Sequence, residues 1–219
     1  MGKLQDKVAI ITGGSGGIGE AAAKRYLAEG AKVVLVDLDG DALATVAARL
    51  GDDVAVYAGD VTTPEANAAM VALATERFGG VDIFLANAGI EGTVAPLTTQ
   101  SVEVFDRVMA VNVRGVWLGL QAVFPAMAKR GGGSVIITSS VAGIGGTAGL
   151  SPYVTSKHAV IGMMRCAALE GAADRIRVNT VNPSPEETRM MRSLEDGMMP
   201  GDGQAAHATI AAGIPLGEY

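Results

Sequence analysis

Tyr153 and Lys157 are the two side chains whose types and spacing most directly suggest acid–base chemistry. They lie four residues apart in a stretch with a helical pattern, so both would project from one face of a helix. A free tyrosine has a pKa of about 10 and is a poor base at neutral pH, but a neighbouring ammonium group would favour the phenolate and lower that pKa. Ser139 and Ser140, which precede the tyrosine, would add two hydroxyl groups.

Each of these residues also has an ordinary explanation. A tyrosine and a lysine at this spacing are common on helix surfaces, and two consecutive serines are usual in loops. What would distinguish a site from a coincidence is its position in the fold, because ligands of open α/β sheets bind at the carboxyl ends of the strands. The strands and helices predicted around Tyr153 and Lys157 therefore decide whether the two residues are interpreted as a site.

The composition indicates a folded chain and excludes several classes of function. Of the 219 residues, 49% are hydrophobic, 18% are charged and 30 are glycine without a Gly-X-Y period, which argues against disorder and collagen. The net charge of −6, without a basic cluster, argues against nucleic-acid binding.

The single cysteine, Cys166, excludes an internal disulfide, and we expect it in the core. The two histidines, His158 and His207, are too far apart to suggest a metal site. Without a signal sequence or an apparent membrane span, we expect a cytoplasmic protein with no membrane partner.

Short apolar runs of strand length alternate with longer alanine-rich stretches of helical pattern. The strand candidates are residues 7–12, 32–36, 54–57, 81–86, 134–138 and 176–181. The helix candidates are residues 18–28, 40–50, a helix that begins at Thr63-Pro64, 101–129 and 152–170. Strands that are apolar throughout, each followed by a helix, favour a parallel sheet with helices on both faces. We therefore predict an α/β fold with a single doubly wound domain over residues 1–219.

A glycine-rich loop, Thr12-Gly-Gly-Ser-Gly-Gly-Ile-Gly19, follows the first predicted strand and opens the next helix. Its glycines allow a tight turn and let backbone N–H groups approach a pyrophosphate at the helix N-terminus, which indicates a dinucleotide. Asp37 lies 18 residues after Gly19, near the spacing expected for the carboxylate that binds the ribose hydroxyls. No Lys-Ser/Thr pair follows the loop, which excludes a mononucleotide P-loop. The predicted contacts here are Gly13, Ser15, Gly17, Ile18, Gly19 and Asp37.

Asp37 also indicates which dinucleotide is bound. Its carboxylate would repel a 2′-phosphate, and neither the glycine loop nor Leu38 offers a cation to attract one, which favours NAD over NADP. Asp60, after the third predicted strand, could hydrogen-bond the adenine edge, with Val61 flanking it. The simpler alternatives are that Asp37 is a solvated loop residue or a helix cap, and that Asp60 is an ordinary turn aspartate.

At this point the chain resembles the short-chain dehydrogenase/reductase family. The resemblance runs from residue 7 to about residue 194 and depends on an ordered set of motifs. They are the glycine loop 12–19, Asn87-Ala-Gly89, Asn112, Ser140 and Tyr153-Val-Thr-Ser-Lys157. The resemblance implies a Rossmann-type domain and adds Asn87, Ala88 and Gly89 to the cofactor contacts.

The resemblance also implies roles for four residues. Tyr153 would be the general acid/base, and Ser140 would hydrogen-bond the reacting oxygen. Lys157 would bind the nicotinamide ribose and lower the pKa of Tyr153, and a positive nicotinamide ring would favour the phenolate further. Asn112 would hold a water molecule in a proton relay. Without the family, Asn112 would be interpreted as a satisfied core amide, since it is a polar residue on an otherwise apolar helical stripe.

Residues 183–219 are predicted to form a substrate lid and a C-terminal segment. The family's Pro-Gly-x-x-x-Thr pattern is here Pro183-Ser-Pro-Glu-Glu-Thr188, so Pro183 and Thr188 are candidate nicotinamide contacts. Ser184 replaces a glycine and Glu186 an apolar residue, whose carboxylate could weaken cofactor closure or turn to solvent. Methionines at 190, 191, 198 and 199 would suit an adaptable apolar pocket or core packing. Family members continue into another helix and a seventh strand, so we expect this domain to lack both.

The predicted function is hydride transfer between NAD(H) and a secondary alcohol or ketone. The Tyr-x-x-x-Lys spacing favours carbonyl chemistry over the related enoyl reductases, and an apolar lid favours an alcohol or hydroxysteroid type of substrate. A 3-oxoacyl-carrier-protein reductase and a truncated or non-catalytic nucleotide-binding relative stay open as alternatives. The expected partners are a small-molecule substrate and a second copy of the chain, paired through helices 101–129 and 152–170. A tetramer would need a completed C-terminus.

Overall fold

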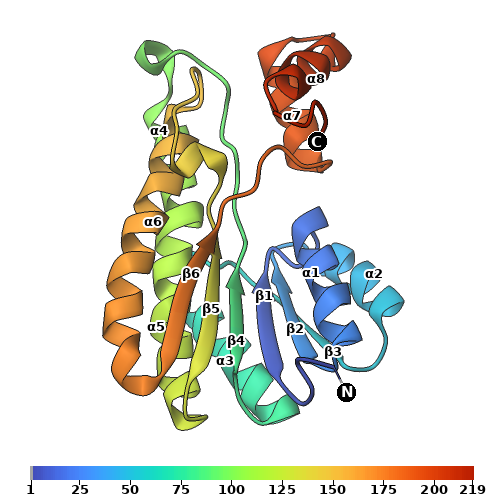
Figure 1. Ribbon diagram of the computed structural model, residues 1–219, viewed down its shortest axis with the longest axis vertical. Coiled ribbons are helices and arrows are strands. Elements are labelled where there is room, and N and C mark those ends of the chain that lie inside the picture. The colour runs from blue at the N-terminus through green and yellow to red at the C-terminus, as the bar shows by residue number, and fades with distance from the viewer. Residues whose placement is uncertain (1) are drawn as a thin grey trace.

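The predicted alternation of strands and helices forms a parallel six-stranded sheet with helices on both faces (Figure 1). The computed structural model describes residues 2–219. The strands are β1 (Val8–Thr12), β2 (Lys32–Asp37), β3 (Val54–Ala58), β4 (Ile83–Ala86), β5 (Gly133–Thr138) and β6 (Ile176–Val181). Their order is β3-β2-β1-β4-β5-β6, so the direction of winding reverses between β1 and β4. Ligands of doubly wound sheets bind at such a reversal, beyond the carboxyl ends of the strands.

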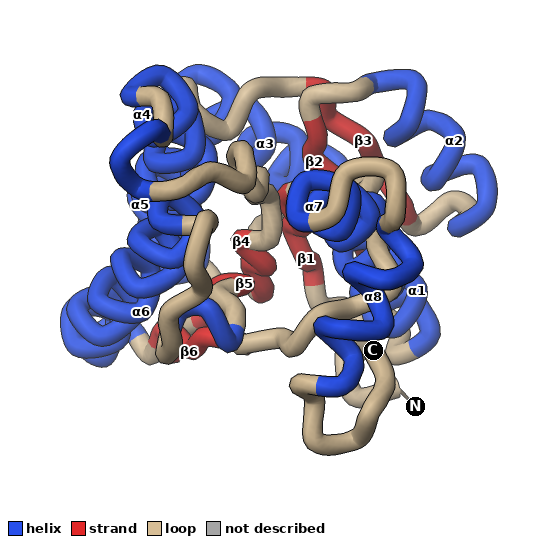
Figure 2. Tube along the Cα trace, turned by 90° about the horizontal axis from the view of Figure 1, so that it is seen from above, coloured by secondary structure: helices blue, strands red, loops and turns tan. Residues whose placement is uncertain are grey.

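The helices divide between the two faces of the sheet. On one face lie α1 (Gly17–Ala28) and α2 (Gly40–Leu50), and on the other α3 (Pro64–Phe78), α4 (Val102–Met109), α5 (Gly115–Lys129) and α6 (Ser151–Gly171). The last two helices, α7 (Arg189–Met198) and α8 (Gly203–Ala212), lie beyond the carboxyl ends of the strands, as Figure 2 shows from above. The fold class predicted from the sequence is thus confirmed.

Alternation along the strands builds a core on each face of the sheet. In β1, Val8 and Ile10 point to the face packed by α3, α5 and α6, whereas Ala9 and Ile11 point to the face packed by α1 and α2. Every residue of β1 is buried, as expected for a central parallel strand with helices on both sides. Within the described residues β6 forms one edge of the sheet, where Arg177 and Asn179 are exposed.

Three details differ from the sequence prediction. The fourth strand begins at Ile83 rather than at residue 81. The helix predicted over residues 101–129 spans Val102–Lys129 but contains a π turn at Ala110–Arg114, where the side chain of Asn112 binds the backbone of a neighbouring segment. Cys166 is exposed rather than in the core, because it lies on the solvent side of α6.

By length and composition alone, the helix Val102–Lys129 would be able to cross a bilayer. Its residues Val116, Leu120, Val123 and Met127 are instead buried in the core under the sheet. The helix is therefore packed as the core helix of a folded domain.

Gly119 and Gly162 offer a matched test of helix packing. A Cβ at Gly119 on α5 would lie 2.6 Å from Cζ of Phe84, whereas a Cβ at Gly162 on α6 would have nothing within 4 Å. We expect Gly119→Ala to lower the free energy of unfolding by about 1–3 kcal/mol through overpacking. Gly162→Ala should raise it by about 0.5–1 kcal/mol because alanine is the better helix former. Urea unfolding followed by circular dichroism measures both, and equal changes would contradict the close packing of α5 on β4.

Candidate active site

The glycine loop folds tightly under the start of α1. Gly13 has a φ of 66°, a conformation that favours glycine, and a Cβ there would lie 3.0 Å from Cα of Ala88. A Cβ at Gly19 would collide with the carbonyl of Gly13, so this glycine allows the helix to begin directly beneath the loop. These two predicted contact residues therefore shape the loop.

Gly17 has a different environment, which fits a bound phosphate group. No protein backbone crowds this position: the nearest atom that a Cβ would meet is Cγ2 of Thr188, 3.2 Å away, just before α7. Gly17, Ile18 and Gly19 form the first turn of α1, whose N–H groups have no acceptor within the helix. The open glycine and these donors are the features that a dinucleotide pyrophosphate requires.

Asp37 lies against the glycine loop, as its spacing predicted. The backbone N–H and the hydroxyl of Ser15 both donate to Asp37 Oδ2, at 3.1 and 2.6 Å, and the N–H of Leu38 donates to Oδ1 at 2.8 Å. The alternative that Asp37 caps a helix is wrong, because Asp39 caps α2. Among the described residues Asp37 forms no ion pair, and Leu38 beside it is 73% exposed.

Asp60 and Val61 follow β3, and Asp60 has the contacts of an ordinary turn aspartate. Asp60 Oδ1 accepts from the N–H of Thr62 at 2.9 Å, as an ordinary turn aspartate does, while its side chain remains exposed. Val61 packs on Gly115 of α5. The position of this turn is fixed by Asn67, which was not predicted: its amide donates to the carbonyls of Val61 and Thr63 at 2.8 and 2.7 Å.

Asn87 connects the ends of three strands. The N–H groups of Asn87 and Ala88 donate to the Thr12 hydroxyl at 3.0 and 3.1 Å, and the Asn87 amide donates to the carbonyls of Thr12 and Gly13. Asn87 Oδ1 accepts from the Thr138 hydroxyl at 3.1 Å. The side chain predicted to contact the cofactor thus bonds within the protein. The structural partners, Thr12 and Thr138, each end an apolar strand, which is the only signal for them in the sequence.

Asn112 is almost completely buried and holds two other elements in place. Its side chain accepts from the N–H of Ile90 at 2.8 Å and donates to the carbonyl of Ile90 at 2.9 Å and to the hydroxyl of Ser156 at 3.0 Å. A Cβ at Gly89 would lie 3.3 Å from Asn112 Oδ1 and 3.5 Å from Lys157 Nζ. Asn112 is therefore a satisfied buried amide that also lies next to the lysine.

Lys157 has a buried ammonium group at the carboxyl end of β5. The side chain is 5% exposed, and Nζ donates to the carbonyl of Thr138 at 2.8 Å. Nζ also lies 5.4 Å from the centre of the Tyr153 ring, so the two residues share one face of α6 as predicted. Burial lowers the pKa of Lys157 from 10.5 to about 8. The hydroxyl of Ser139 donates to the Lys157 carbonyl and fixes the helix to the strand end.

Tyr153 behaves differently from the sequence expectation. Burial raises its pKa, a hydrogen bond with Ser140 acts in the opposite direction, and the carboxylate of Glu91 raises it again. The expected lowering of the Tyr153 pKa by Lys157 is therefore wrong, because the ammonium donates to the Thr138 carbonyl rather than to the phenol. Ser140 lies beside the tyrosine, where its hydroxyl also accepts from the N–H of Ala142.

The segment after β6 carries the remaining candidates. The carbonyl of Pro183 accepts from the N–H of Val141 at 3.0 Å, and Thr188 caps α7 while facing Gly17. Glu186 is exposed, so its carboxylate turns to solvent. The four methionines of α7 and its C-terminal end are half-buried or exposed, which excludes core packing for them. No group of histidine, cysteine or acidic side chains within residues 2–219 could hold a metal ion.

Comparison with known proteins identifies the family. The model of a family described as short chain dehydrogenase matches residues 7–198. Levodione reductase from Leifsonia aquatica is 40% identical over 196 residues, which cover 87% of this chain and 73% of that protein. 2-(R)-Hydroxypropyl-CoM dehydrogenase from Xanthobacter autotrophicus is 40% identical over 190 residues, covering 84% of this chain and 76% of that protein.

Solved structures agree with these relatives. The crystal structure of levodione reductase superposes with a TM-score of 0.96 at 36% identity, covering 99% of this chain and 86% of that one. NAD+-bound xylitol dehydrogenase gives a TM-score of 0.91 at 31% identity, covering 99% and 88% of the two chains. The chain belongs to the short-chain dehydrogenase/reductase family. It is an oxidoreductase of that family with a single Rossmann-type domain.

The buried ammonium of Lys157 predicts how stability depends on pH. Because its pKa falls from 10.5 in the unfolded chain to about 8 in the folded protein, the unfolded chain binds more protons between these values. The free energy of unfolding should therefore gain about 2 kcal/mol from this group between about pH 8 and pH 10. Lys157→Met removes the contribution, so the difference between wild type and variant, measured by urea unfolding, should grow with pH. A difference that stays constant would show that the ammonium is well solvated.

Proposed function

We propose that this protein is an NAD-dependent dehydrogenase that interconverts a secondary alcohol and a ketone, with Tyr153 as the general acid/base. The observation that carries the proposal is the meeting of Tyr153, Ser140 and the buried Lys157 at the carboxyl end of β5. The glycine loop lies at the carboxyl end of the same sheet, and hydrogen bonds through Asn87 connect it to β5. The groups proposed for proton transfer and for cofactor binding therefore lie at the same end of the sheet.

The preference for NAD is supported by the position of Asp37. Its carboxylate occupies the end of β2 where the ribose of the adenosine half would bind, and it would hydrogen-bond the two ribose hydroxyls. A 2′-phosphate there would meet a like charge without a neighbouring cation. Gly13, Ser15, Gly17 and Ile18 would hold the pyrophosphate, and Lys157, Pro183 and Thr188 the nicotinamide half.

When bound, NAD+ supplies the acceptor for the hydride that leaves the alcohol carbon. The protein's own part is to orient the substrate and move the hydroxyl proton. Ser140 would hydrogen-bond the reacting oxygen, and Tyr153 would take its proton in the direction of oxidation or return it in the direction of reduction. Asn112 lies next to Lys157 and would help to hold water that passes the proton to solvent.

The raised pKa of Tyr153 gives this mechanism an order of events. The phenol is protonated at neutral pH, and burial raises its pKa further. The positive charge of an oxidised nicotinamide ring would favour the phenolate, so the bound cofactor would promote formation of the base.

The substrate class follows from the cleft and from the relatives. The half-buried methionines on α7 would supply a flexible apolar wall if they face the substrate, which would suit an alcohol or hydroxysteroid type of substrate. The relatives named above are dehydrogenases and a reductase, which supports carbonyl and alcohol chemistry.

We also propose a cytoplasmic homodimer formed through α4, α5 and α6. These helices expose large apolar side chains, which a second copy would cover. They are Val102, Phe105, Trp117 and Leu169, which are 40–81% exposed. The exposed thiol of Cys166 supports a reducing compartment.

Cofactor preference can be tested with a matched pair of aspartates. Wild-type protein should bind NADH at least about tenfold more tightly than NADPH, as one charge-assisted hydrogen bond is worth that much. Asp37→Asn should bring the two affinities close together, because it removes the repulsion without changing the size of the side chain. Asp39→Asn, which changes the helix cap two residues away, should leave the ratio unchanged. Titration by nucleotide fluorescence measures all three, and equal wild-type affinities would refute the role of Asp37.

The role of Tyr153 can be separated from binding. Tyr153→Phe should lower kcat by about a hundredfold or more, because it removes the proton donor and acceptor, while the dissociation constant of NADH stays within about twofold. Tyr26→Phe on α1 is the matched control and should retain full turnover. The assay is nucleotide absorbance in a screen of secondary alcohols, ketones, steroids and β-hydroxyacyl thioesters. Retained turnover in Tyr153→Phe would exclude it as the acid/base.

A further inference from the structure

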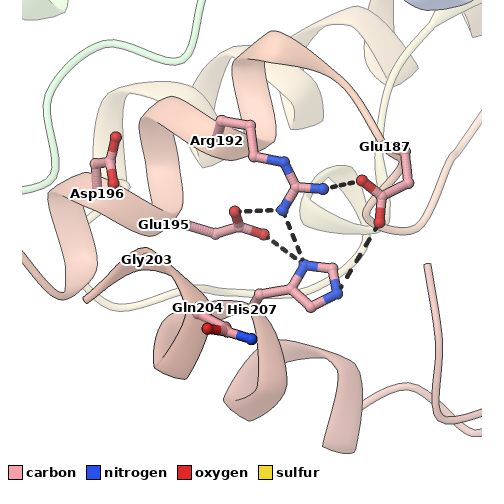
Figure 3. Close-up of a pocket in the computed structure, with 7 residues that line it drawn as sticks. All are labelled: Glu187, Arg192, Glu195, Asp196, Gly203, Gln204 and His207. Carbon is pink, nitrogen blue, oxygen red and sulfur yellow. Dashed lines mark hydrogen bonds and ion pairs between the residues drawn. The ribbon is translucent and has the colours of Figure 1, made fainter. Parts of the chain in front are cut away.

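A network of charged side chains joins α7 to α8 around a cavity of about 410 Å³ (Figure 3). Glu195 on α7 is at its centre. Arg192 donates to Glu195 Oε2 at 2.7 Å, the Tyr219 hydroxyl donates to Oε1 at 2.8 Å, and Nδ1 of His207 on α8 lies 2.9 Å from Oε1. Arg192 also pairs with Glu187, next to the start of α7.

Glu195 is a carboxylate buried at a helix–helix contact, since it is only 2% exposed. Burial alone would raise its pKa, but the hydrogen bonds with Tyr219, Arg192 and His207 outweigh that effect and lower it. Burial, together with the hydrogen bond and the negative charge of Glu195, raises the pKa of Tyr219 to about 12. The carboxylate is therefore charged at neutral pH and bonded on both oxygens.

Little else holds this pair of helices to the domain. α7 and α8 pack chiefly on each other, and both lie beyond the strand ends in Figures 1 and 2. α7 approaches the cleft at its two ends. Thr188 faces Gly17 at one end, and at the other a Cβ on Gly197 would lie 2.8 Å from Cγ2 of Val94. Between these two end contacts, the position of α7 depends on its packing against α8.

We propose that Glu195 is a positioning residue that fixes α7 against α8 and so keeps Thr188 facing the glycine loop. The cleft that Thr188 faces is the cofactor site of the proposed function, and the inference depends on that assignment. Loss of the carboxylate would leave the Arg192 guanidinium, the Tyr219 hydroxyl and the His207 ring facing one another without their shared acceptor. The helices would then separate and Thr188 would leave its position.

A control variant is needed that removes an acidic charge from the same helix without removing the buried hydrogen bonds of Glu195. Asp196, the next residue on α7, is also acidic and lines the same cavity, but it is exposed and forms no ion pair within the described residues. Each substitution therefore removes one negative charge without a change in side-chain size. Glu195→Gln does so at the buried centre of the network, and Asp196→Asn does so at its exposed neighbour.

The first readout needs neither cofactor nor activity. Trypsin cleavage after Arg189 and Arg192, followed by mass spectrometry, reports how often α7 opens. We expect cleavage at these two sites to be about tenfold faster in Glu195→Gln, the equivalent of one lost charge-assisted hydrogen bond, and unchanged in Asp196→Asn. Tyr219→Phe, which removes one hydrogen bond and no charge, should give a smaller increase in the same direction.

The second readout separates positioning from stability. Glu195→Gln should raise the dissociation constant of NADH and the KM for NAD severalfold while kcat at saturation stays near the wild-type value. A residue that only stabilised the fold would lower the amount of active protein, and with it the apparent kcat, at unchanged KM. Tyr219→Phe keeps the test valid if Glu195→Gln does not fold.

Two results would overturn the inference: unchanged cleavage and NADH affinity in Glu195→Gln, or equal effects of Glu195→Gln and Asp196→Asn. Failure of the proposed function is recognisable separately, because wild-type protein would then bind no NADH. In that event the cleavage rates alone decide whether Glu195 fixes α7 to α8.

Discussion

The hydrogen bond from the buried Lys157 ammonium to the Thr138 carbonyl is the contact on which the site depends. A buried ammonium without an acceptor would be very costly, so the last residue of β5 and the second turn of α6 are held in one arrangement. Thr138 in turn donates to Asn87, which donates to the carbonyls of Thr12 and Gly13. One series of hydrogen bonds therefore runs from the lysine to the glycine loop, and it positions the proposed acid–base residues and the proposed cofactor loop together.

The strand ends and the α7–α8 pair are stabilised by different interactions. The strand ends are positioned by apolar packing on both faces of the sheet and by hydrogen bonds between polar groups of neighbouring strands. The α7–α8 pair above them has few apolar contacts with the sheet and is organised by the charges around Glu195. Apolar packing is insensitive to salt and to single charges, whereas a network of ion pairs responds to both. The strand ends are thus suited to hold the proposed reacting groups in place, whereas the α7–α8 pair is suited to change position.

The sequence was sufficient for the features that depend on local pattern. Apolar runs located all six strands, and the spacing from Gly19 located Asp37 beside the loop. Features that depend on contacts between distant segments were not predicted. The amide of Asn112 binds the backbone of Ile90 at the π turn, and the ammonium of Lys157 donates to the Thr138 carbonyl, while burial dominates the pKa of Tyr153. The central place of Glu195 was not predicted either: Arg192 lies three residues away on the same helix, but the other partners come from α8 and from Tyr219.

The contact between Ser15 and Asp37 has a consequence for how easily the cofactor could change. The Asp37 carboxylate accepts from two donors of the loop, the N–H and the hydroxyl of Ser15. Without that carboxylate, both donors would be free to bind another anion, next to a helix N-terminus that itself attracts anions. The loop therefore presents its donors to a negative group, and Asp37 supplies that group from within the chain. Under the proposed function, discrimination between the two nicotinamide dinucleotides would depend on this single internal anion, and a change at one position could reverse it in evolution without rebuilding the backbone.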